Sequence, residues 1–278
     1  MNQIFNFNRF SLLVAKHWAE NRKRYFLSIV AFASLLFVWY VFVMLIDDTN
    51  PLADGLQQIS FFFSLFLVGP FYASQFFNDL DSRTRGTNFL MVPASTFEKF
   101  LCGFFYAIIM FFIVFLVSFY IVGFFTVSIA NAVHPSYNSV VNQDVTVVKA
   151  HVINVFETRM EIPVEVTFYF MLLFFAVQSA ALLGSVYFSR YSYIKTAISL
   201  TLVCVIVFVL EYNLTKNLMP RGRFFEGRGT YIFDMEEGKG NLVQLPAQVV
   251  NTLLFLFKYS FPPIFWITTY FRLKEKEI

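Results

Sequence analysis

The chain has 278 residues, of which 58% are hydrophobic and only 14% charged, and its formal net charge is +3. A water-soluble domain of this length cannot bury so much apolar surface, so the composition excludes an ordinary soluble protein and predicts an all-α integral membrane protein. The small positive charge is explained by orientation in the lipid bilayer, and we expect no nucleic-acid partner.

Residues 4–20 precede the first apolar run and predict an amphipathic helix lying in the membrane interface. Four large apolar side chains recur there on one helical stripe, namely Phe7, Phe10, Val14 and Trp18. The basic residues Arg22, Lys23 and Arg24 should mark the point where the chain turns into the bilayer. The alternative is a plain cytoplasmic extension.

Four apolar runs exceed the roughly 20 residues that a helix needs to cross about 30 Å of hydrocarbon. These runs are 25–46, 56–77, 100–133 and 166–188. A fifth run, 196–210, has only 15 residues, and its flanks extend it to a span at 194–214. A sixth, 246–271, contains Pro262 and Pro263. The sixth is therefore either a kinked span or a shorter span preceded by a re-entrant segment. We predict six transmembrane helices in one domain that covers the whole chain.

The distribution of lysine and arginine predicts the topology. Residues 1–24 carry five basic residues, whereas the first short loop, 47–55, has none. Both termini should therefore be cytoplasmic, with long external loops at 134–165 and 212–246. The first of these loops mixes β-branched with polar residues, which predicts a small external cap that contains β-structure.

The sequence contains no motif for catalysis or nucleotide binding. The phosphate-loop pattern G-x-x-x-x-G-K-[ST] does not occur, and neither do H-E-x-x-H and G-x-S-x-G. We therefore expect no enzyme activity, no catalytic residue and no cofactor in this chain. We expect no metal site either, because the spacing of the available ligands matches no known motif: His134, Asp144, His151 and Glu157.

The most specific feature is a polar stretch between the second and third apolar runs, residues 78–100. Its acidic and basic residues come first, and Gly86 permits a sharp turn after Asp79, Asp81, Arg83 and Arg85. Helix-cap signals then precede the third span, at Pro93, Ser95, Glu98 and Lys99. We predict one short amphipathic helix and a turn, which could transmit a push from a soluble partner into two membrane helices. The alternative is an ordinary inner loop, which also needs polar residues and a cap.

The segment 89–100, FLMVPASTFEKF, resembles the L-M-L-P-A-S-x-x-E-K motif that follows the second span of bacterial type 2 ABC transporter permeases. Val92 replaces the usual leucine. The resemblance implies a permease subunit of the bacterial inner membrane that exports a hydrophobic or amphipathic substrate. It also implies a second permease subunit, in a homodimer or heterodimer, and cytoplasmic ABC ATPase subunits that bind ATP and Mg²⁺.

By the same resemblance, residues 78–99 are the coupling helix that contacts the ATPase. The residues that inherit this role are Asp79, Asp81, Arg83, Arg85, Pro93, Glu98 and Lys99. The long external loops depart from the most compact family members. The alternative function is a membrane anchor or sensor that binds a partner through these loops and transports nothing.

Two ionisable residues fall in apolar runs, where charge is costly and usually functional. Lys258 stands near the middle of the last run, and Glu211 ends the fifth. We hypothesise that they pair, or that Lys258 faces an anionic group in the translocation pathway. The alternative is that Lys258 lies close enough to the external interface to reach water.

Overall fold

A computed structural model of the chain describes residues 5–46, 52–81, 83–133, 137–141, 144–156, 163–188, 191–218, 230–233, 241–244 and 247–277. Within these residues, five helices are long and apolar enough to cross a membrane. They are α1 (Phe7–Ile46), α2 (Asp54–Ala73), the continuous helix Thr96–Val133, α6 (Val164–Tyr187) and the part Ser192–Leu210 of α7 (Ser192–Leu218). The chain is thus a mainly helical protein with several helices able to cross a membrane, as its composition predicts.

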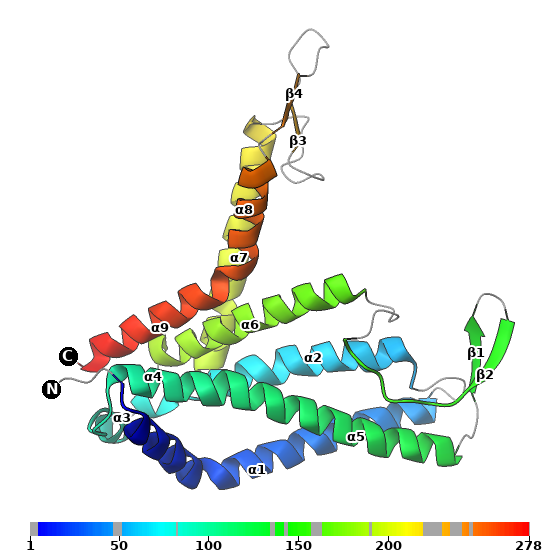
Figure 1. The fold of residues 1–278 in the computed structure, drawn as a ribbon, viewed down its shortest axis with the longest axis horizontal. Helices are drawn as coiled ribbons and strands as arrows, with labels where there is room; N and C mark the ends of the chain where they lie inside the picture. Colours follow the sequence, from blue (N-terminus) through cyan, green and yellow to red (C-terminus); the bar gives the residue numbers. More distant parts are fainter. Residues whose placement is uncertain are drawn as a thin grey trace.

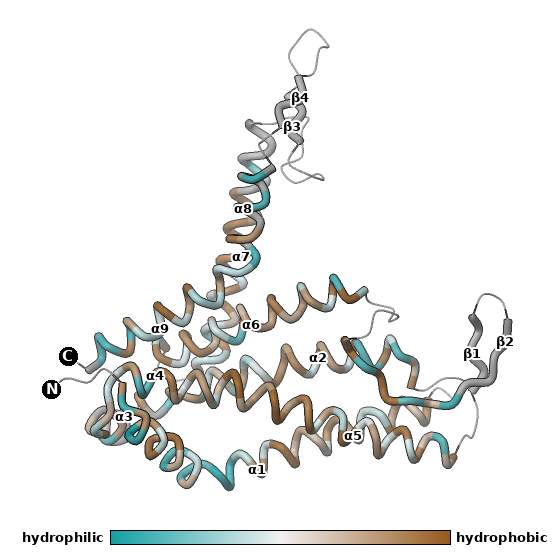
Figure 2. Tube along the Cα trace, in the orientation of Figure 1, coloured by the Kyte–Doolittle hydropathy of each residue, from teal (hydrophilic) through white to brown (hydrophobic). Residues whose placement is uncertain are grey.

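The long helices α1, α2, α5 (Phe111–Val133) and α6 form an elongated bundle (Figure 1). Its core is built mainly from aromatic side chains, and the largest fully buried ones include Tyr40, Phe61, Phe119 and Phe174. Figure 2 shows mostly apolar residues along the middle of the bundle, with hydrophilic residues gathered near α3 (Arg83–Leu90) and at the end of α9 (Phe261–Glu277). The start of α1 and the end of α9 lie at this same end of the bundle (Figure 1).

Helix α1 differs from the predicted interfacial helix followed by a separate span. Residues 7–46 form one helix, which bends but does not break (Figure 1). The reason is that α1 contains neither glycine nor proline, so the charges at Arg22, Lys23 and Arg24 do not interrupt it. At 1.5 Å per residue, α1 is about 60 Å long, roughly twice the hydrocarbon thickness. Part of α1 therefore lies outside the hydrocarbon or oblique to it.

The third long helix contains a π-helical segment, η2 (Phe105–Met110), between α4 (Thr96–Phe104) and α5. A π-turn inserts one extra residue and disturbs the regular backbone hydrogen bonds. Gln178 of α6 is fully buried, and its amide Nε2 donates to the carbonyl oxygen of Ala107 at 2.6 Å. A side chain from a neighbouring helix thus supplies a hydrogen bond inside the π-helical segment.

The polar stretch forms a short 3-10 helix η1 (Asn78–Asp81), helix α3 and a turn before α4. The predicted short helix is present, but Gly86 lies inside α3 rather than in a turn. The turn instead occupies residues 91–94, where Pro93 lacks the N–H that a continuing helix needs. Ser95 is the N-cap of α4, as its type and spacing predict.

The predicted last span, 246–271, is not one helix. Helix α8 (Ala247–Tyr259) ends before Ser260, and α9 begins at Phe261. Pro262 and Pro263 fall in the first turn of α9, where a missing N–H costs little, whereas an uninterrupted helix would have lost two hydrogen bonds. Helix α9 packs on α6, while α7 and α8 point away from the bundle (Figure 1).

Two antiparallel hairpins lie in the two long loops. Strands β1 (Tyr137–Val141) and β2 (Asp144–Val148) pair within the loop predicted to contain β-structure, and they lie at the end of the bundle opposite α3 (Figure 1). Strands β3 (Thr230–Phe233) and β4 (Asn241–Gln244) pair within the second loop.

Candidate functional site

The predicted coupling residues lie at the end of the bundle where α1 starts. Asp79 and Asp81 belong to η1, and Arg83 and Arg85 belong to α3, but their side chains lie outside the described residues. Pro93 is exposed in the turn before α4, whereas Glu98 and Lys99 are buried in the first turn of α4. The structure therefore tests the surroundings of the last three residues only.

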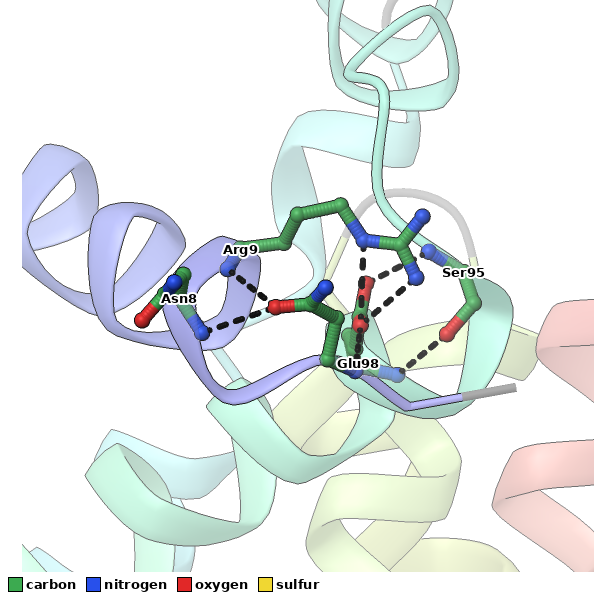
Figure 3. Close-up of polar contacts among 5 residues, drawn as sticks. Asn8, Arg9, Ser95 and Glu98 are labelled. Carbon is green, nitrogen blue, oxygen red and sulfur yellow. Dashed lines mark hydrogen bonds and ion pairs between the residues drawn. The ribbon is translucent and has the colours of Figure 1, made fainter. Parts of the chain in front are cut away.

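Four residues, Asn6, Arg9, Ser95 and Glu98, form what we call the Glu98 cluster (Figure 3). Ser95 and Glu98 make a reciprocal capping box: the Glu98 amide donates to Ser95 Oγ at 3.2 Å, and the Ser95 amide donates to Glu98 Oε2 at 2.9 Å. Glu98 Oε1 accepts from the Asn6 amide at 2.7 Å and from Arg9 Nη2 at 2.9 Å. One carboxylate thus joins the start of α4 to the start of α1.

Asn6 caps α1 in the same way as Ser95 caps α4. Its Oδ1 accepts from the amide of Asn8 at 3.0 Å and from the amide of Arg9 at 3.5 Å. Two helix N-termini, each carrying partial positive charge, therefore meet at Glu98. The side chain of Glu98 is 0% exposed and that of Arg9 is 40% exposed. Burial of this charge is tolerable because it has a guanidinium partner and several N–H donors.

Lys99 connects α4 to α3. Its ammonium lies 5.8 Å from the ring centroid of Phe89, near the end of α3, at cation–π distance. Lys99 is buried and lines a cavity of about 190 Å³ together with residues of α1 and α3, among them His17 and Asn88. The first turn of α4 thus contacts both α1 and α3.

A second, open groove of about 550 Å³ adjoins the Glu98 cluster. It runs between the first turns of α1 and the turn after α3, and its lining includes Arg9, Lys16, Asn88, Met91 and Pro93. Met91 is 75% exposed at the tip of this turn. The groove therefore offers a basic wall and an exposed flexible apolar side chain next to a rigid polar cluster.

Sequence reasoning identified Ser95 and Glu98 but missed Asn6 and Arg9 as members of the cluster. Arg9 contributed to the topology prediction only, and Asn6 was not considered. The available signal was an asparagine directly before a long helix, because asparagine is a preferred N-cap. Nothing local could show that this cap meets a glutamate 92 residues further along the chain.

The structure describes the surroundings of one of the two intramembrane candidates. Lys258 of α8 contacts Tyr169 of α6: its Nζ donates to the Tyr169 hydroxyl at 2.8 Å and lies 4.7 Å from the ring centroid. Tyr169 was not predicted as a partner. The side chain of Glu211, in α7, lies outside the described residues, so the proposed pair stays a prediction.

Replacing Lys258 with methionine should destabilise the protein by about 1 kcal/mol, because it removes both a hydrogen bond and a cation–π contact. Tyr169→Phe keeps the ring and should cost less. Lys274→Met, at an exposed position of α9, is the matched control. Thermal unfolding of the full chain in detergent measures the effect, and equal stability of Lys258→Met and the control would contradict it.

Within the described residues, no group of three or more histidine, cysteine, aspartate or glutamate side chains is arranged to hold a metal ion. His151 Nε2 lies 3.3 Å from Asp54 Oδ1, which joins the loop between α5 and α6 to the start of α2. The side chains of His134, Asp144 and Glu157 lie outside the described residues.

No protein-family model, curated protein or solved structure matches this chain. Function is therefore inferred from the geometry of α3 and the Glu98 cluster, together with the motif at residues 89–100.

Proposed function

We propose that the chain is the permease subunit of an ABC exporter of the bacterial inner membrane. In this proposal it forms the membrane pathway for a hydrophobic or amphipathic substrate and is driven by separate cytoplasmic ATPase subunits. The observation that carries the proposal is α3, a short helix between two helices that are able to cross a membrane. The Glu98 cluster holds the start of α4, the helix that follows α3.

A displacement of α3 would be transmitted to the long helices through its two connections. At one end α3 follows η1, which a turn at residues 74–77 joins to α2; at the other, a turn of four residues leads to the capping box of α4. Because Glu98 also binds Asn6 and Arg9, displacement of this turn must move the start of α1 as well. Three long helices are thus coupled to one surface element.

The groove beside the cluster supports a protein partner. Its exposed methionine and basic wall offer the mixture of adaptable apolar contact and charge that protein interfaces use. A second permease subunit is supported by α7, in which every side chain from Thr201 to Leu210 is exposed. In the proposed assembly, these side chains face lipid or the second subunit.

The experiment that tests the proposal is purification of the chain from its native membrane in mild detergent, with co-purifying proteins identified by mass spectrometry. A stoichiometric ATPase that carries a phosphate loop is the expected result. Its reproducible absence would overturn the exporter proposal and favour an anchor or sensor that uses the external loops.

Reversing both arginines of α3, Arg83→Glu and Arg85→Glu, should lower the recovered ATPase at least about tenfold, because charge reversal at an interface costs more than about 1.4 kcal/mol. Lys274→Glu with Lys276→Glu makes the same charge change in α9, at the same end of the bundle, and should leave recovery unchanged. Equal recovery of the ATPase from both double variants would show that α3 does not contact it.

A further inference from the structure

A partly open pocket of about 120 Å³ lies between α1, α2, η2 and α5. One part of its wall is mostly apolar, with Phe32 from α1, Val68 from α2, and Val114 and Phe115 from α5 next to Ser118. Apolar cavities of about this size stay dry and accept small apolar groups. The cavity therefore suits hydrocarbon rather than water or an ion.

The opposite part of the wall carries hydroxyl groups. Tyr25, Tyr72 and Tyr106 line it, one from each of α1, α2 and η2. The Tyr25 hydroxyl lies 2.5 Å from His17 Nε2, and the Tyr106 hydroxyl donates to the carbonyl oxygen of Val14 at 2.9 Å. Their hydrogen bonds hold the Tyr25 and Tyr106 side chains in place along this part of the pocket.

Three basic residues stand next to Tyr25 in α1. Arg22, Lys23 and Arg24 precede Tyr25 in α1 and are exposed, and Arg24 contacts the side-chain oxygen of Gln75. Trp18, half exposed, lines the same cavity. Indole and basic side chains together are typical of the boundary between hydrocarbon and headgroups, where each cation attracts anionic lipid.

We propose that this pocket takes part of an alkyl chain of an anionic phospholipid, whose headgroup lies near Arg22, Lys23 and Arg24. The apolar wall contacts the chain, the tyrosine side chains lie toward the glycerol region, and the three cations provide charge complementarity. This site is separate from the Glu98 cluster and from the groove beside α3, and it does not depend on whether the chain transports a substrate.

Binding can be measured by native mass spectrometry of the full chain in detergent, titrated with phosphatidylglycerol or with phosphatidylcholine of the same acyl chains. We expect phosphatidylglycerol to bind at least about tenfold more tightly, because each basic residue near a membrane surface favours anionic lipid. Equal affinity for the two lipids would overturn the proposal.

Val114→Trp fills the cavity from α5 and should reduce the affinity for phosphatidylglycerol at least about tenfold. Val117→Trp, one helical turn away on a side chain that is 52% exposed, is the matched control and should bind like the unmodified chain. Val68→Phe fills the cavity from α2. It is the variant to test if Val114→Trp does not fold. Full binding by a folded cavity-filling variant would overturn the proposal.

The charge requirement is tested separately by the triple substitution Arg22→Gln, Lys23→Gln and Arg24→Gln, which should abolish the preference for phosphatidylglycerol. Lys274→Gln with Lys276→Gln removes charge elsewhere and should preserve it. Persistence of the preference in the triple variant would overturn the assigned headgroup position. Recovery of a co-purifying ATPase should not change in any of these variants, which keeps this test distinct from that of the exporter proposal.

Discussion

Replacing Arg9 with methionine is expected to destabilise the protein by about 3 kcal/mol, the low end of what breaking a buried ion pair costs. The change removes the guanidinium that lies 2.9 Å from Glu98, whose side chain is fully buried. The amides of Asn6 and Ser95 still donate to the carboxylate, and Arg9 itself is 40% exposed, so a larger loss is not expected. Titration with SDS in mixed micelles measures the free energy of unfolding.

The double variant Arg9→Met with Glu98→Gln should recover part of this loss, because it removes the buried charge together with its partner. Lys16→Met is the matched control: Lys16 forms an exposed pair with Glu20 at 3.9 Å in the same helix, and its loss should cost less than about 1 kcal/mol. A double variant less stable than Arg9→Met would show that Glu98 stabilises the fold through its hydrogen bonds rather than its charge.

Replacing Gly184 with alanine is expected to destabilise the packing of α6 on α7 by about 1–3 kcal/mol, the usual cost of overpacking. A Cβ at this position would overlap Thr196 Oγ1 and would lie 2.8 Å from Thr196 Cβ. Small residues let membrane helices approach closely. At Gly184 the absence of a side chain lets Thr196 of α7 lie directly against α6. Thermal unfolding in detergent measures the loss.

Two further variants make this result specific. Thr196→Ala in the Gly184→Ala background removes the overlapping hydroxyl and should restore part of the stability. Gly123→Ala is the milder control, because its Cβ would come no closer than 3.3 Å to a methyl group of Val152. If Gly184→Ala is as stable as Gly123→Ala, α6 and α7 do not pack as the structure shows.

Local signals in the sequence predicted the type of most elements but not every boundary. Apolar runs predicted the long helices because crossing a bilayer demands length and hydrophobicity, and both are visible in one dimension. Residues 7–46 form one helix because charge alone does not end a helix, and the prediction that its first part lies in the membrane interface stays a prediction. Pro262 and Pro263 did signal the break near Ser260, since the effect of proline is local.

The candidate site was predictable only where it is local. Ser95 and Glu98 stand at capping-box spacing, so their pairing follows from the sequence. The contacts of Glu98 with Asn6 and Arg9, like that of Gln178 with Ala107, join residues far apart in the chain. Such contacts depend on how helices pack, and no pattern of residue types in one segment specifies them.

The π-helical segment has a consequence for how one helix selects its neighbours. Phe104 and Phe111 are seven residues apart, so an unbroken α-helix would point both rings in nearly the same direction. The extra residue in η2 turns everything after it by roughly 100°. Phe104 accordingly packs against Trp266 of α9 at 4.9 Å, while Phe111 stacks on Tyr72 of α2 at 5.4 Å. Two aromatic residues seven positions apart thus contact two different helices. The continuous helix Thr96–Val133 changes its packing partner at the π-helical segment.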